Sequence, residues 1–196
     1  MHWFAVVLST CVGMASAPAL TSAQERKVPE TYTAITTNMT PANVEIKVDV
    51  IRWSTEEERA AVVKALADAE DTVAALRELP TLGVVWRSGS PVGNSIKYAD
   101  RAIAADGSER ITLVTDKPVG STSFNPWTAE DSGLATELDY SVIEMTTGEA
   151  GAGTMSLGAA VTFDRASQTV ALDRGTAPAL LTDVRKVPKP YWANSN

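Results

Sequence analysis

The chain has 196 residues, of which 24 are acidic and 17 are basic, so its formal net charge is −7 at pH 7. Proteins that bind nucleic acid or an anionic membrane carry clustered Lys and Arg, and this sequence contains no basic stripe. We therefore expect no nucleic-acid partner and no attraction to an anionic membrane surface.

The first residues have the pattern of an export signal. Phe4 to Leu20 are apolar or small and uncharged, and Thr21 to Ala23 are the small residues that a signal peptidase recognises. We expect residues 1–23 to be a cleavable signal peptide and the protein to be periplasmic or secreted, with no membrane span after cleavage. The alternative is an uncleaved anchor, because Met1 to Trp3 contain no Lys or Arg.

A single β-rich domain is expected over residues 24–196. It would contain neither His nor Cys, because His2 and Cys11 are the only ones in the chain. A Ser-His-Asp triad requires an imidazole, a Cys nucleophile requires a thiol, and typical zinc and copper sites require one or the other. We therefore name no catalytic residue and expect no metal and no cofactor.

Two strands open this domain. Tyr32 to Met39 contains three Thr, a Tyr and an Ile, a composition that favours a strand. Val44 to Val50 alternates apolar with charged residues, which predicts a strand with one buried and one solvated face.

A helical segment follows, and Pro80 ends it. Ser54 or Thr55, with Glu57 or Glu58 three residues later, can form a capping box at its start. Its apolar positions recur at spacings of four and three, at Val62, Leu66, Ala69, Val73 and Leu76. The polar stretch at 67–71 leaves open whether this is one helix or two short ones.

The rest of the chain is a series of strand patterns joined by turn signals. The expected strands are Leu82–Arg87, Ser95–Arg101, Arg110–Thr115, Leu138–Thr146, Thr154–Phe163, Thr169–Asp173 and Leu180–Val187. The predicted fold class is α+β and mostly antiparallel β. About eight or nine strands form a meander, curled as a barrel or folded as a sandwich, with the helical segment inserted after the second strand.

The segment Asp116 to Glu137 shows no clear period. Long stretches without secondary structure are uncommon in compact domains and often carry function, although an exposed linker is the alternative. Phe124 and Trp127 favour function, because an exposed loop has no packing reason to carry two large aromatic side chains. Together with Trp86 and Tyr98, they are our candidate lining residues for a ligand site.

Two charged residues fall on faces that are otherwise apolar. Glu144 continues the series from Leu138, and Arg52 continues the series Val44 to Val50. The preferred interpretation is that the face with Glu144 emerges to solvent, or that an inward Arg52–Glu144 pair satisfies the carboxylate. The alternative is that both are polar anchors in a ligand cavity.

Carboxylates are the remaining groups that can carry catalysis. One set surrounds a turn and consists of Asp100, Asp106 and Glu109. The other set lies on or beside a strand and consists of Glu137, Asp139 and Glu144. Two carboxylates at a suitable separation hydrolyse glycosides, so a carboxylate-based hydrolase is a third hypothesis.

Four segments carry a resemblance to known sequences: Ile51–Arg59, Leu79–Gly83, Ser95–Ala99 and Asp106–Ile111. Together they resemble a group of small exported bacterial proteins for which no activity is known. The resemblance implies export and carries no chemistry with it.

The function that these patterns favour is a non-enzymatic binding protein for a small, apolar ligand held between the sheet and the loop. The alternative is an interaction module whose aromatic loop docks on an envelope protein.

Overall fold

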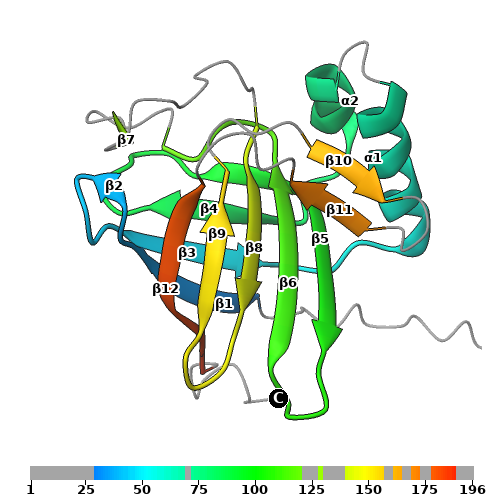
Figure 1. The fold of residues 1–196 in the computed structure, drawn as a ribbon. Helices are drawn as coiled ribbons and strands as arrows, with labels where there is room; N and C mark the ends of the chain where they lie inside the picture. The colour runs from blue at the N-terminus through cyan, green and yellow to red at the C-terminus, as the bar shows by residue number, and fades with distance from the viewer. Residues whose placement is uncertain are drawn as a thin grey trace, which may run out of the picture.

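A computed structural model describes residues 29–68, 72–120, 128–129, 140–156, 161–164, 169–172 and 178–188. Its centre is a closed antiparallel barrel, in which the strands follow one another around the wall in the order β1-β12-β9-β8-β6-β5-β4-β3 (Figure 1). The strands are β1 (Glu30–Thr36), β3 (Glu45–Val50), β4 (Gly83–Arg87), β5 (Asn94–Ile103), β6 (Glu109–Thr115), β8 (Val142–Thr146), β9 (Ala152–Met155) and β12 (Ala179–Val187). The predicted meander is confirmed, and of the two forms left open it takes the barrel.

The barrel closes because β1 pairs on both of its edges. Thr31 lies opposite Asp49 of β3 and opposite Val187 of β12, so the first strand joins the second long strand and the last. Closure leaves no unpaired strand edge in the wall.

Apolar side chains fill the barrel interior. Ile46, Val48 and Val50 point inward and are at most 1% exposed, as the alternation in this strand predicts. They belong to one continuous core with inward side chains from the other strands, including Tyr32, Ile96, Leu113, Met145, Met155 and Leu181. An eight-stranded barrel is just wide enough for side chains to fill it or for one small ligand, and in this barrel the described side chains occupy the space.

A helical layer covers part of the outer wall. The helices α1 (Glu56–Asp68) and α2 (Thr72–Glu78) lie between β3 and β4 in the chain, so the expected segment is two short helices. The capping box is present, because the Glu58 carboxylate accepts from the Thr55 N–H at 2.9 Å and the Thr55 hydroxyl accepts from the Glu58 N–H at 3.2 Å. No helix in the described part of the chain has the length and apolar content needed to cross a membrane.

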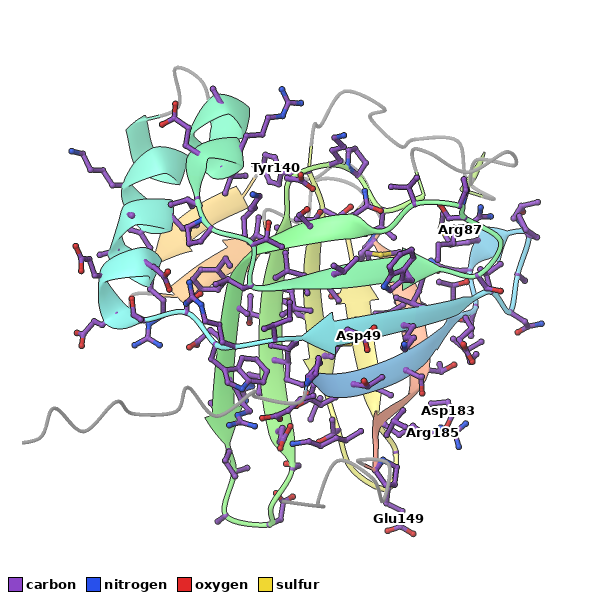
Figure 2. All side chains as sticks on the ribbon, turned by 180° about the vertical axis from the view of Figure 1, so that it is seen from behind. Asp49, Arg87, Tyr140, Glu149, Asp183 and Arg185 are labelled. Atoms are coloured by element: carbon purple, nitrogen blue, oxygen red, sulfur yellow. The ribbon has the colours of Figure 1, made fainter. Side chains whose placement is uncertain are left out.

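The helices pack on outward side chains of the barrel wall. Val62 of α1 and Leu76 of α2 are fully buried, as the predicted seam requires. They form a second apolar cluster with outward side chains of β5, β6 and β8, namely Tyr98, Val114 and Val142. Tyr140, which is labelled beside the helices in Figure 2, belongs to the same cluster.

Lys97 ties α2 to the wall. This side chain is 8% exposed, and its Nζ donates to the carbonyl of Leu79 at 2.9 Å and to the carbonyl of Arg77 at 3.4 Å. A cation at these last carbonyls also complements the dipole of the helix.

Two predicted strands are wrong as continuous elements. Tyr32–Met39 is interrupted, because β1 ends at Thr36 and Met39 belongs to β2 (Met39–Thr40), a strand of a separate two-stranded sheet. Thr154–Phe163 was expected to be continuous, but β9 ends at Met155, and β10 (Val161–Asp164) belongs to a separate two-stranded sheet with β11 (Thr169–Leu172). At the end of β9 the hydroxyl of Ser156 accepts a hydrogen bond from the N–H of Val142 at 3.0 Å. This side-chain contact occupies a backbone donor of β8 at the point where β9 ends. A further small sheet joins β2 (Met39–Thr40) to β7 (Thr128–Ala129).

Candidate functional site

Two polar regions lie at the end of the barrel where the hairpins β5–β6 and β8–β9 turn. The side chains of the first point inward and close this end of the core; we call it the inner network, and it consists of Glu30, Tyr32, Arg101, Glu109 and Lys186. The second is a depression on the outer face of β6, β8 and β9; we call it the outer groove, and it is lined by Arg110, Thr112, Glu144, Met145, Thr146, Ala150, Ala152, Gly153 and Thr154. In Figure 2 the labelled Glu149 marks the β8–β9 turn at this end.

The inner network is centred on the hydroxyl of Tyr32. The ring of Tyr32 is fully buried, and its hydroxyl lies 2.6 Å from a carboxylate oxygen of Glu109 and 3.1 Å from one of Glu30. Lys186 bridges the same two carboxylates at 2.7 and 2.8 Å. Arg101 contacts Glu30 at 2.8 Å and Glu109 at 3.6 Å. Four strands of the wall are therefore joined at one point.

Trp53 packs beneath this network. Its ring meets that of Tyr32 edge-on, with centroids 6.5 Å apart, and the Arg101 guanidinium lies 4.6 Å from the centre of the indole. The cation–π contact and the ion pairs hold Arg101 from two sides. This end of the barrel is thus closed by an aromatic pair and a set of mutually paired charges.

The environment holds both network carboxyls in the ionised form. Burial disfavours the charge of Glu30, but the hydrogen bond from Lys186 and the charges of Lys186 and Arg101 outweigh it, so the pKa is lowered. For Glu109, burial is likewise outweighed by hydrogen bonds from Lys186 and Tyr32, and its pKa is also lowered. Burial, reinforced by the two carboxylates, raises the pKa of Tyr32 and keeps its hydroxyl protonated.

These pKa directions bear on the hydrolase hypothesis. Glu30 and Glu109 do converge, since both accept from the one hydroxyl. A glycosidase, however, needs one carboxylic acid whose pKa is raised so that it protonates the leaving group, and here both pKa values are lowered. Neither carboxyl of the network is therefore suited to the role of general acid in glycoside hydrolysis.

The other acidic residues that surround the β5–β6 turn do not join in a cleft. Asp100 pairs with Arg59 of α1 at 3.1 Å, and the exposed Asp106 accepts from Ser108 within the turn. Within the described ranges, no group of three or more His, Cys, Asp or Glu is placed to hold a metal ion. Glu137 and Asp139 lie outside the described residues.

The outer groove has a volume of about 500 Å³, within the range of small-molecule sites. It is open, and its rim is polar, with hydroxyls from Thr112, Thr146 and Thr154. Ala152, on the outward face of β9, contributes only a methyl group to the groove, and the backbone of Gly153 follows it. Gly153 is required there, since a Cβ would lie 2.4 Å from the carbonyl oxygen of Glu144.

The groove contains two charged side chains, Arg110 and Glu144. Arg110 and Glu144 form no ion pair or hydrogen bond with each other. Neither side chain forms such a contact with any other described residue. Arg110 is exposed and Glu144 is half-buried. Both are therefore our candidates for contacts to a ligand.

The groove contains one of the residues predicted from the sequence. Glu144 lies on the outward face of β8, where that face passes from the helical layer into solvent, as the preferred interpretation stated. The expected pair with Arg52 does not form: Arg52 donates to Glu58 through both terminal nitrogens, at 2.6 and 2.7 Å. Arg52 follows the end of β3, and β3 is not a neighbour of β8 in the wall.

The two aromatic candidates among the described residues, Tyr98 and Trp86, do not share one site. Tyr98 is 1% exposed in the cluster beneath the helices, whereas Trp86 is 37% exposed on the outer face of β4. The ring of Trp86 lies against Gly93, where a Cβ would be 3.0 Å away. Phe124 and Trp127 lie outside the described residues.

Sequence reasoning missed Arg110 and the threonines of the groove. Their signal was present, because Arg110 and Thr112 alternate with the buried Ile111 and Leu113. Alternation shows which residues face outward, but not that those of three strands form one depression. Comparison with protein-family models, curated proteins and solved structures finds no match to this chain.

Proposed function

We propose that this chain is an exported, non-enzymatic binding protein that takes a small polar ligand in the outer groove. The observation that carries the proposal is a concave site with a guanidinium and a carboxylate that form no ion pair or hydrogen bond with a described residue. Precisely placed polar groups give a pocket its specificity, and hydrogen bonds to charged groups are stronger than those between neutral ones. The apolar start of the chain, residues 4–20, supports export.

The polar nature of the ligand follows from the two faces of the barrel wall. The interior, where an apolar ligand would lie, is occupied by core side chains that are nearly all fully buried. The concave surface lies outside and is lined by hydroxyls and charges. An apolar ligand held by Phe124 and Trp127 is a separate hypothesis, which concerns residues outside those described.

The experiment is a thermal-shift screen of the full chain against small polar metabolites, repeated with Ala152→Trp. Ala152 is exposed on β9, and Trp is favourable in strands, so this variant fills the groove without disturbing the core. Thr33→Trp, at a half-buried position on the outward face of β1, is the matched control.

We expect ligands that stabilise the wild type and Thr33→Trp to lose affinity about tenfold or more in Ala152→Trp. If every stabilising ligand acts equally on Ala152→Trp, the groove is not the binding site and the proposal is wrong.

A second candidate is an interaction module for an envelope protein. Trp86 supports it, because an aromatic ring that is 37% exposed on the wall is the kind of anchor that protein interfaces use. A Trp86→Ala variant that loses a co-purifying protein while keeping its groove ligand would assign these two surfaces separate roles.

A further inference from the structure

We infer that the outer groove recognises small zwitterions, molecules such as a free amino acid or a dipeptide that carry both a carboxylate and an ammonium group. This inference rests on the proposed function and specifies its ligand. It is argued from the register of three neighbouring strands and from the charges that they carry.

The register arranges the groove residues in two rows across the wall. In the first row Thr112 of β6, Glu144 of β8 and Thr154 of β9 lie opposite one another. In the second row, nearer the turns, the corresponding residues are Arg110, Thr146 and Ala152. Both rows point outward, because the residues between them, such as Ile111 and Met145, are buried in the core.

Arg110 and Glu144 are therefore diagonal neighbours on adjacent strands. Such positions lie about 7–8 Å apart, within reach of long side chains. The two nevertheless form no ion pair in the structure, although ion pairs as long as 3.6 Å occur in the inner network. A small ligand that spans this separation would contact the positive guanidinium of Arg110 at one end and the negative carboxylate of Glu144 at the other.

Each of the two charges selects a different ligand group. The guanidinium of Arg110 has parallel N–H donors that match a carboxylate, and the carboxylate of Glu144 accepts from an ammonium group. The hydroxyls of Thr112, Thr146 and Thr154 both donate and accept, so they can satisfy a peptide N–H or C=O between the two ends. The small side chain of Ala152 leaves room for the ligand backbone.

Ligands of a single charge fit this arrangement less well. A phosphate or a dianion would meet Glu144 beside Arg110, and the whole chain carries a net charge of −7. A neutral sugar would use the hydroxyls but leave both charges without a partner, which costs the binding energy that charge-assisted hydrogen bonds supply. A zwitterion satisfies both groups at once.

The test is isothermal titration of the full chain with three related dipeptide probes. Glycylglycine carries both charges, N-acetylglycylglycine lacks the ammonium group, and glycylglycinamide lacks the carboxylate. We expect glycylglycine to bind at least about tenfold more tightly than either analogue, since each analogue loses one charge-assisted contact.

Matched variants assign each contact. Arg110→Gln is expected to abolish the preference for the free carboxylate, with Arg185→Gln as the control at an exposed arginine of β12. Glu144→Gln is expected to abolish the preference for the free ammonium group, with Glu45→Gln as the control at an exposed glutamate of β3. An unchanged melting temperature shows in each case that the variant is folded.

Two results overturn the inference, and they are distinguishable from failure of the proposed function. If glycylglycine fails to bind, or binds no more tightly than its analogues, while another ligand remains sensitive to Ala152→Trp, the site is real but not zwitterion-selective. If no ligand is sensitive to Ala152→Trp, the proposed function itself fails.

Discussion

Glu109 and Arg110 are neighbours in the chain, yet they belong to two regions that treat charge in opposite ways. Glu109 points inward and shares its carboxylate with Tyr32, Lys186 and Arg101. Arg110 points outward and, among the described residues, forms no ion pair. The inner network contains charges that pair with one another at the end of the core, so we expect it to contribute to stability. The outer groove contains charges that form no ion pair or hydrogen bond with a described residue, and we propose that it serves binding.

Acidification is expected to have the largest effect on this comparison, because it removes the charge of both network carboxylates. Their pKa values in the folded protein lie below the ordinary value of 4.5, so the unfolded chain takes up protons first as the pH falls. The stabilisation is fully present above 4.5 and is lost as the pH falls through the lowered values. The measurement is the melting temperature from about pH 7 to about pH 3.

The control for this titration is Glu109→Gln, whose melting temperature should fall less steeply with acid than that of the wild type. Glu58, whose pKa Arg52 lowers to about 2, contributes equally to both proteins and cancels in the difference. Parallel curves for the two proteins would show that the network does not cause the acid sensitivity.

At neutral pH, Glu109→Gln is expected to lower the free energy of unfolding by about 2 kcal/mol, because Arg101, Lys186 and Tyr32 lose a shared charged acceptor. Glu144→Gln is the matched change in the groove and should stay within about 0.5 kcal/mol of the wild type. Chemical denaturation measures both. Equal costs at the two positions would contradict the distinction between the regions.

Tyr32→Phe removes only the hydroxyl at the centre of the network and should cost about 1 kcal/mol. Tyr98→Phe is the control, since this ring is equally buried and the structure gives its hydroxyl no hydrogen bond to a described residue. A loss for Tyr98→Phe as large as that for Tyr32→Phe would mean that the hydroxyl contacts are not what stabilises this end of the barrel.

The smallest effect is expected from a double-mutant cycle on Arg110→Gln and Glu144→Gln. Because the two side chains do not pair, their effects on stability should add within about 0.5 kcal/mol. The same cycle on Arg101→Gln and Glu30→Gln should give a clear coupling, because those side chains lie 2.8 Å apart. Coupling in the groove pair would show that its charges already satisfy each other.

Local patterns predicted much of the fold, because they depend on nearby residues. The alternation from Val44 to Val50 identified the inward face of β3, and the spacing of Thr55 and Glu58 identified the start of α1. The prediction of one continuous strand over Thr154–Phe163 was wrong because it also depended on local alternation alone. Alternation persists across a break, and only the partner strands show that β9 and β10 belong to different sheets.

The candidate site was less predictable, because its residues are distant in sequence. Glu144 was recognised from its place in an alternating series, but its neighbours across the wall were not. Arg52 was assigned to Glu144, whereas the capping box placed Glu58 much nearer, six residues along the chain.

By itself, the sequence determined the class of the fold, the inward face of its clearest strand and the helices after β3, since each depends on a local period or cap. It also restricted the chemistry beyond residue 11, which contains no His and no Cys. Only the tertiary structure decided that β1 closes on β12, and therefore that Glu30 and Lys186 meet Glu109 inside the barrel while Arg110 and Glu144 lie outside. The reason is that strand pairing sets which distant residues share a face, and no local pattern contains the register.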